Sequence, residues 1–309
     1  MTARTMADVV SHYTADSGAV VWRLSGVDQL AAIYDDHRAG TIAPVGDHGR
    51  RRSIEGDSPF FGGSPADAVR LAREGWPDGE RKLADALKRA DALALAGAGN
   101  LSGFSSDLSA LPDLVPSAAP AARWDLGDYM TGAPDLYREQ VPPPARVLRL
   151  VLDGAVSAAV KPHEIQAAAG ALVAVVQRLQ AQGVTVSVDL VFGGEAASNA
   201  PGIVCLIPVI SEGRTMELDR LAFWLSHPCA LRRFGFALYE LTAPVLSGDY
   251  GRPLVASPMA LAALQADVAR DPCAILLPSL QTVINGAGRV PLVEWAMLEW
   301  SNAVQGGAA

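Results

Sequence analysis

The sequence has little cysteine and no long hydrophobic run, and both absences limit what the protein can be. Its three cysteines, Cys205, Cys229 and Cys273, are dispersed and form no Cys-x-x-Cys pair. Neither a disulfide framework nor a zinc knuckle is therefore indicated. No apolar run approaches the ~20 residues that a membrane-spanning helix needs, and the amino-terminal residues lack the apolar core of a secretory signal. We therefore expect a soluble, cytoplasmic protein without a membrane partner.

Positive charge is also scarce, because 25 lysines and arginines face 33 aspartates and glutamates, which gives a net charge of −8. This balance argues against general binding of polyanions over the whole surface. The one dense basic cluster consists of Arg50, Arg51 and Arg52. No interleaved aromatic residues that could stack on bases accompany it, so a solvated loop is the favoured interpretation. Contact with an anion, a protein partner or a nucleic acid is the alternative for these arginines.

Several catalytic signatures are missing. The sequence contains no Gly-x-Ser-x-Gly elbow, no Walker loop and no His-Glu-x-x-His pair. One enzymatic alternative stays open, namely a metal-dependent enzyme that acts on phosphoester or nucleic-acid substrates through Asp153, Asp189 and Glu195. Alternation along its predicted strand places Asp189 in the middle of the strand, which is a poor position for a catalytic ligand. A non-enzymatic role is therefore favoured.

Half of the sequence is hydrophobic, which allows a sizeable core. Its pattern divides the chain into three regions. Residues 1–95 form a mixed and partly helical module with a helical hairpin, in which Trp76 is the expected packing anchor. Residues 96–145 are a proline-rich irregular connection, and the triple proline Pro142-Pro143-Pro144 marks the domain boundary at its end. Residues 146–309 are predicted to form an α/β domain.

The α/β domain is predicted from an apolar run, a helical pattern and a second apolar run that follow one another. The run Val147–Leu152 is nearly unbroken, as expected for a strand covered on both faces. Pro162 opens a helix that Gly183 terminates, and Val184–Phe192 follows as a second strand. This spacing predicts a right-handed βαβ crossover.

A third strand, Ile203–Ile210, contains Pro208, which lacks a backbone donor and favours the edge of a sheet. Such an edge strand can run antiparallel to the second strand after a short connection. We therefore predict an α/β fold with a doubly wound, mostly parallel sheet, an antiparallel edge strand and an N-terminal α-helical module. The later predicted elements are helices that meet at Pro228, a strand at Ala274–Leu277 and a final helix at Pro291–Val304.

Three polar residues surround the predicted helix break at Pro228. His227 precedes the proline, and we expect it to be packed or to cap a helix rather than to act in catalysis. Arg232 and Arg233 follow the break. Paired arginines on a helix surface are usually solvated, and contact with a partner carboxylate or an anion is the alternative.

Ligands of doubly wound sheets bind at the carboxyl ends of the strands, where this sequence places Asp153, Ser157 and Thr215. These residues resemble the metal-ion-dependent adhesion site of the von Willebrand factor A-type family. Asp153 and Ser157 match an Asp-x-Ser-x-Ser motif after the first strand, and Thr215 matches a threonine after the third strand. Ala155 stands in place of the first serine of the motif, and Leu277-Pro278-Ser279 lacks the aspartate that commonly follows the fourth strand. The site is therefore degenerate.

The resemblance implies a von Willebrand A-like fold and binding of a protein partner at this rim, with or without Mg²⁺. If no metal binds, Asp153 is expected to accept hydrogen bonds from the backbone amides that follow it. Members of the family often act as adaptors of AAA+ ATPases or as assembly components, so we expect a non-enzymatic interaction protein. Residues 61–79 and 219–240 are also similar to uncharacterised bacteriophage and prophage proteins. This similarity implies no activity, and it adds a phage origin to the hypothesis of an interaction or assembly protein.

Overall fold

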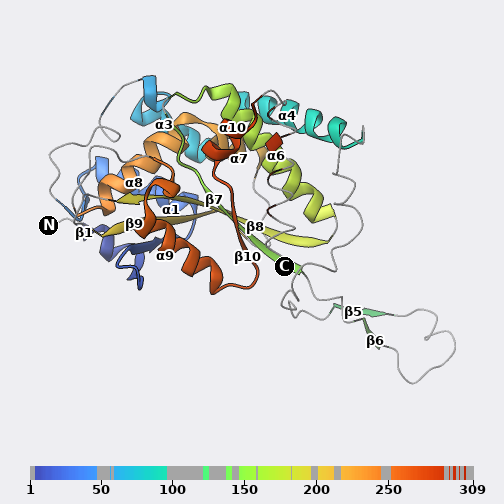
Figure 1. Ribbon diagram of the computed structural model, residues 1–309, viewed down its shortest axis with the longest axis horizontal. Coiled ribbons are helices and arrows are strands. Elements are labelled where there is room, and N and C mark those ends of the chain that lie inside the picture. The colour runs from blue at the N-terminus through green and yellow to red at the C-terminus, as the bar shows by residue number, and fades with distance from the viewer. Residues whose placement is uncertain are drawn as a thin grey trace.

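The computed structural model shows an α/β protein built around one six-stranded sheet (Figure 1). It describes residues 4–46, 56, 59–95, 121–124, 137–140, 146–157, 159–181, 183–195, 201–211, 217–244, 252–288, 292, 295–296, 299 and 303. The strand order in the sheet is β10-β7-β8-β9-β3-β2. The bounds of these strands are β2 (Ser11–Thr14), β3 (Val20–Arg23), β7 (Arg146–Asp153), β8 (Val184–Glu195), β9 (Gly202–Ile210) and β10 (Ala274–Leu277).

Two smaller sheets accompany the main one. A parallel pair is formed by β1 (Arg4–Thr5) and β4 (Ile42–Ala43), and an antiparallel pair is formed by β5 (Ala121–Trp124) and β6 (Tyr137–Gln140). The α-helices are α1 (Val27–Arg38), α3 (Pro65–Glu74), α4 (Pro77–Leu95), α6 (Pro162–Ala181), α7 (Leu218–Ser226), α8 (Gly235–Thr242), α9 (Pro258–Ala269) and α10 (Leu280–Gly286). Short helical turns occur at η1 (Met6–Asp8), η2 (Pro59–Phe61), η5 (Cys229–Phe234) and η6 (Leu254–Ala256).

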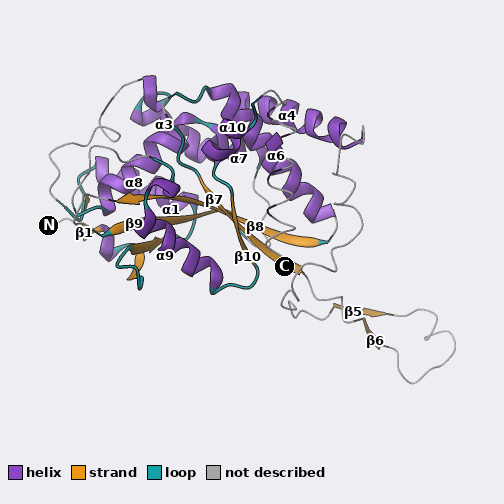
Figure 2. Ribbon diagram, viewed as in Figure 1, coloured by secondary structure: helices purple, strands orange, loops and turns teal. Residues whose placement is uncertain are grey.

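Helices cover both faces of the main sheet. Leu148, Leu150 and Leu152 of β7 point into the larger core, which contains α1, α3, α4, α6, α7 and α8. Val151, between them, points into a smaller core formed with α9 and Leu254 of η6. Figure 2 shows α9 on one side of the strands and α4, α6 and α7 on the other. Because alternate residues of β7 are buried on opposite faces, its sequence is apolar almost without interruption.

The predicted crossover from β7 through α6 to β8 is confirmed. The two strands pair in parallel from Arg146 opposite Val184 to Asp153 opposite Val191. The helix begins at Pro162, and Gly183 follows it with a φ of +82°, a left-handed conformation that favours glycine. Its predicted apolar stripe, Ile165, Ala169, Leu172, Val176 and Leu179, is buried.

The third predicted strand, β9, runs antiparallel to β8, as expected, but it does not lie at the edge of the sheet. The amino-terminal strand β3 pairs in parallel with β9, and β2 extends the sheet beyond it. Pro208 is tolerated because the pairing with β3 ends at Leu206, before the proline. Three of the five neighbouring strand pairs are parallel, so the sheet is mostly parallel.

The predicted helical hairpin is present as α3 and α4, and α4 packs against α6 and α7. Gly75, at the junction, has a φ of +87°, and a Cβ atom there would collide with the carboxylate of Asp219. Trp76 packs against the main core as expected. The amino-terminal region thus shares a core and a sheet with the residues after 146, whereas the predicted domain borders at 95 and 146 stay predictions.

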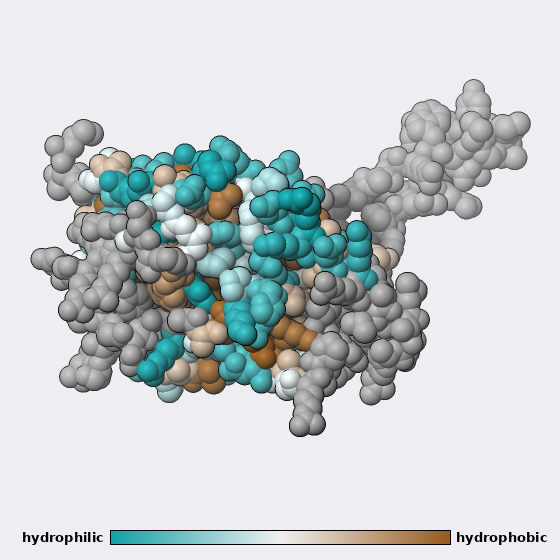
Figure 3. Space-filling model, turned by 90° about the horizontal axis from the view of Figure 1, so that it is seen from above, coloured by the Kyte–Doolittle hydropathy of each residue, from teal (hydrophilic) through white to brown (hydrophobic). Residues whose placement is uncertain are grey.

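The described surface has mixed character. On the face seen in Figure 3, hydrophilic residues surround small hydrophobic areas. Within the described ranges, no helix has the length and apolar character needed to cross a membrane. The predicted final helix, Pro291–Val304, lies largely outside the described residues.

Candidate functional site

The direction of the strands creates two edges at which ligands could bind. The carboxyl ends of β7, β8 and β10 meet at one edge, because these strands are parallel. We call the residues that follow β7 and β10 there, 153–161 and 278–281, the rim. Since β9 and β3 run in the opposite direction, their carboxyl ends meet at the other edge, which we call the far edge. Both edges have the position in which α/β proteins bind ligands.

Both carboxylate oxygens of Asp153, the predicted centre of the rim, accept hydrogen bonds from the backbone of the protein. Its Oδ1 accepts a hydrogen bond from the backbone N–H of Ala155 at 3.0 Å, and its Oδ2 accepts one from Leu254 at 2.7 Å. The residue is 5% exposed. Burial raises the pKa of Asp153 to about 6, although the two hydrogen bonds act in the opposite direction. Asp153 therefore joins the rim to η6, a role that includes the predicted bond to a following amide.

Ser157 lies at the exposed tip of the rim. Its backbone N–H donates to Oε1 of Gln281 on α10 at 2.7 Å, which ties the loop after β7 to the loop after β10. Its Oγ accepts from the backbone N–H of Ala159 at 3.2 Å. The rim thus holds its shape through hydrogen bonds between its own residues.

These contacts do not fit the Mg²⁺ ion implied by the resemblance. Each carboxylate oxygen of Asp153 accepts one N–H group and the residue is buried, so an ion could reach the carboxylate only if the segments that cover it moved. Among the described residues, no group of three or more His, Cys, Asp or Glu side chains could hold a metal. Thr215 lies outside the described residues, and its described neighbours Ser211 and Glu217 line a cavity at the far edge. Because β9 runs antiparallel to β8, its carboxyl end lies at the far edge and not at the rim. The metal ion therefore stays a prediction without support from the rim.

Arg232 binds the backbone of the rim. It belongs to the π-helical turn η5 and is buried, contrary to the expected solvated surface. Its Nη2 donates to the carbonyl oxygens of Ser157 at 2.9 Å and of Val160 at 3.1 Å. Its guanidinium also lies over the ring of Phe60, 4.9 Å from the centroid. The arginine therefore fixes the loop after β7 rather than facing solvent.

Arg233, the next residue, binds a different segment. It is fully buried, and its Nη2 donates to the carbonyl oxygens of Gly56 at 2.8 Å and Gly63 at 2.5 Å. Its guanidinium lies 4.9 Å from the ring centroid of Phe61. A partner or an anion could reach either arginine only if these segments moved away. The predicted basic cluster Arg50–Arg52 lies outside the described residues.

His227 is packed and capping, as expected. Its Nδ1 accepts a hydrogen bond from the backbone N–H of Cys229 at 3.1 Å, and its ring packs on Phe223 and Trp76. Burial, assisted by the charge of Lys82, lowers the pKa of His227 to about 4. The ring is therefore neutral near neutral pH and serves the fold.

Asp189, part of the enzymatic alternative, is also committed to the fold. Arg149 donates from Nε to Oδ2 of Asp189 at 2.8 Å, and it lies 3.7 Å from Asp267 of α9. Burial raises the pKa of Asp189, and the charge of Arg149 opposes this effect. The pair anchors α9 to the sheet, so Asp189 does not serve as a free carboxylate at the rim.

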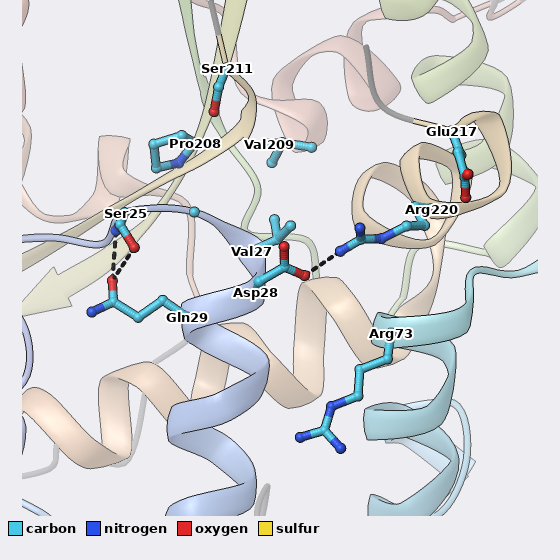
Figure 4. Close-up of a pocket in the computed structure, with 11 residues that line it drawn as sticks. Ser25, Val27, Asp28, Gln29, Arg73, Pro208, Val209, Ser211, Glu217 and Arg220 are labelled. Carbon is cyan, nitrogen blue, oxygen red and sulfur yellow. Dashed lines mark hydrogen bonds and ion pairs between the residues drawn. The ribbon is translucent and has the colours of Figure 1, made fainter. Parts of the chain in front are cut away.

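A polar cavity of about 490 Å³ opens at the far edge (Figure 4). It lies where β3 leads into α1 and where β9 ends. Its lining residues are Ser25, Gly26, Val27, Asp28, Gln29, Arg73, Pro208, Val209, Ser211, Glu217 and Arg220. The sequence pattern gives no sign of this cavity, because segments far apart in the chain line it.

Comparison with known proteins gives one match. The family model described as "Domain of unknown function (DUF7192)" matches residues 122–293. The search of curated proteins gives no match, and neither does the search of solved structures.

Proposed function

We propose a binding function for this chain, which belongs to the DUF7192 family because that family's model matches more than half of its residues. In this proposal the chain is a non-enzymatic interaction or assembly protein that docks a protein partner on the rim. An AAA+ ATPase is the kind of partner that the von Willebrand A resemblance suggests, and a phage assembly component is the kind that the similarity of residues 61–79 and 219–240 to bacteriophage proteins suggests. The rim acts without a metal ion.

The arrangement of the strands supports this proposal. Two features predicted for this part of the chain are present: β7 and β8 are parallel neighbours, and β9 runs antiparallel to β8. Asp153 stands at the end of β7, where the resemblance places the start of the adhesion site. The side chains depart from that site at Ala155, which is buried.

The observation that carries the proposal is the double hydrogen bond of Asp153. Its carboxylate binds the amides of Ala155 and Leu254, so the group best placed to bind a metal or act in catalysis holds two segments together instead. With Arg232 bound to Ser157 and Gln281 bound to the same residue, the rim is a preformed surface. A preformed surface loses little conformational entropy when a partner binds.

The exposed residues of the rim provide the test. Lys161 lies exposed at the end of the loop after β7, and Gln177 lies exposed four turns further along α6. We expect Lys161→Gln to weaken binding to the partner and Gln177→Glu to leave it unchanged, because both lower the net charge by one unit but only the first lies at the rim.

The partner for this experiment comes from the neighbouring genes. An AAA+ ATPase gene beside this one supports an adaptor, and capsid or tail genes favour an assembly component. Binding of that neighbour to wild type and both variants is measured by surface plasmon resonance. Equal loss of binding in the two variants would place the docking surface away from the rim and contradict the proposal.

A further inference from the structure

The far-edge cavity lies at the opposite end of the strands from the rim, and it has no part in the function proposed above. Five segments of the chain contribute to it: the β3–α1 junction, the first turn of α1, α3, the end of β9 and the start of α7. Its lining is predominantly polar. Small ligands bind in concave sites where a few convergent polar groups fix their orientation, and a polar lining favours a polar ligand.

Arg220 is the most enclosed charged group of the cavity. Its side chain is 24% exposed, and its backbone N–H is held by Oδ1 of Asp219 at 2.6 Å. The backbone carbonyl of Asp219 in turn accepts from Trp76 at 3.2 Å, which fixes the start of α7 to the α3–α4 junction. The backbone that carries the Arg220 side chain is thus held in place.

The donors of Arg220 are mostly unused. A guanidinium carries five N–H donors. Within the described part of the chain, the guanidinium of Arg220 donates only to Oδ1 of Asp28, and its buried Nε has no acceptor. Figure 4 shows this ion pair at the centre of the cavity. A buried donor without an acceptor is costly, so Arg220 has more capacity for an anion than Asp28 satisfies.

Asp28 has the properties of an exchangeable counter-ion. Its side chain is 78% exposed, in contrast to that of Arg220. Ion pairs with an exposed carboxylate are weak because water and salt compete for the charges. An incoming anion can therefore replace Asp28 at Arg220 with little loss.

The rest of the cavity suits hydroxyl groups. Gln29 is fixed, since its Oε1 accepts from the backbone N–H of Ser25 at 2.6 Å and its Nε2 donates to Val9. The Glu217 carboxylate and the Ser211 hydroxyl line the opposite side and can accept from ligand hydroxyls (Figure 4). A volume of about 490 Å³ exceeds what a single phosphate fills. The ligand is therefore larger than the anion that anchors it.

We propose that this cavity binds a small hydroxylated phosphate ester of the sugar-phosphate class, with Arg220 as the anchor of the phosphate and Asp28 as the group that the phosphate displaces. The start of α1 adds a favourable partial positive charge, and it has no side-chain cap. Arg73 also lines the cavity, but its guanidinium is paired at 3.0 Å with Asp35 and points away from Arg220.

The test measures binding of ribose 5-phosphate by isothermal titration calorimetry at constant ionic strength. Asp28→Asn and Arg220→Gln break the same ion pair, so they match in their effect on the fold. We expect Asp28→Asn to tighten binding about two- to fivefold, because the competing carboxylate is gone. Arg220→Gln should weaken it about tenfold or more, because the charge-assisted bonds are lost. Arg73→Gln, which removes an equal charge from the same cavity, should change binding less than about twofold.

Two further probes separate the parts of the ligand. Ribose without phosphate should not bind, and inorganic phosphate should bind more weakly than ribose 5-phosphate. Equal affinity for the two phosphates would show that the cavity recognises an isolated anion and would overturn the sugar-phosphate assignment. The site itself is refuted if wild type shows no binding, or if Asp28→Asn and Arg220→Gln change the affinity in the same direction.

Discussion

Asp153 should make the stability of the protein depend on pH in an unusual direction. Carboxylates that ion pairs or hydrogen bonds stabilise in the folded state usually have lowered pKa values, whereas burial raises the pKa of Asp153 from 3.8 to about 6. Between these two values the folded state binds more protons than the unfolded state. Stability contributed by this group is therefore greatest below about pH 4 and is lost as the pH rises to about pH 6.

The size of the effect follows from the two pKa values. One pKa unit corresponds to about 1.4 kcal/mol, so the full loss is about 3 kcal/mol. Asp153→Asn removes the titrating group. It also replaces one of the two accepting oxygens with an NH₂ group, which cannot accept a hydrogen bond, and this loss costs a constant amount at every pH. The difference in unfolding free energy between wild type and variant should therefore favour wild type increasingly as the pH falls.

Urea unfolding followed by tryptophan fluorescence measures this difference. Wild type and Asp153→Asn are compared at fixed ionic strength from about pH 4 to about pH 7.5, so that other titrating groups cancel in the difference. The difference in unfolding free energy between the two proteins should change most steeply with pH below about pH 6. Parallel pH profiles for the two proteins would refute the buried, doubly bonded state of Asp153.

Three other predictions concern the fold and the absence of catalysis. Arg232→Met should lower the free energy of urea unfolding by about 3 kcal/mol, because buried carbonyl groups of the rim lose their donor. It should also raise the rate of amide hydrogen exchange in the loop after β7. An unchanged exchange rate there would contradict the supporting role of the arginine. Gly75→Ala should cost about 2 kcal/mol, since the carboxylate of Asp219 must move in addition to the strain of a positive φ, whereas Gly183→Ala, which has a similar φ and open space, should cost about 1 kcal/mol. A screen of phosphatase and nuclease substrates should show no activity that Asp153→Ala removes, and activity lost in that variant would favour the enzymatic alternative.

The elements that were predicted correctly are those whose signals are local. The crossover from β7 to β8 is marked by two apolar runs and a helical stripe that ends at Gly183, and each signal lies within its own segment. The helix break at Pro228 and the packed His227 were likewise visible in adjacent residues. Local steric and hydrogen-bonding rules are sufficient for such features.

The features that were missed depend on contacts between distant segments. The edge position of β9 was wrong because β3, a strand of four residues, pairs with it from the other end of the chain. Arg232 was expected in solvent because its carbonyl acceptors lie more than 70 residues away in the sequence. The far-edge cavity combines segments that lie far apart in the sequence. The hydrophobic periodicity of a segment does not show which distant segment it will contact.

Titration of Mg²⁺ into chelator-stripped protein tests most directly the claim that the rim is held together by its own hydrogen bonds. The calorimeter should record no saturable heat, and the melting temperature should not shift, because Asp153 is buried and each of its oxygens is held by a backbone amide. Saturable binding of one ion per chain that Asp153→Ala abolishes would contradict this account.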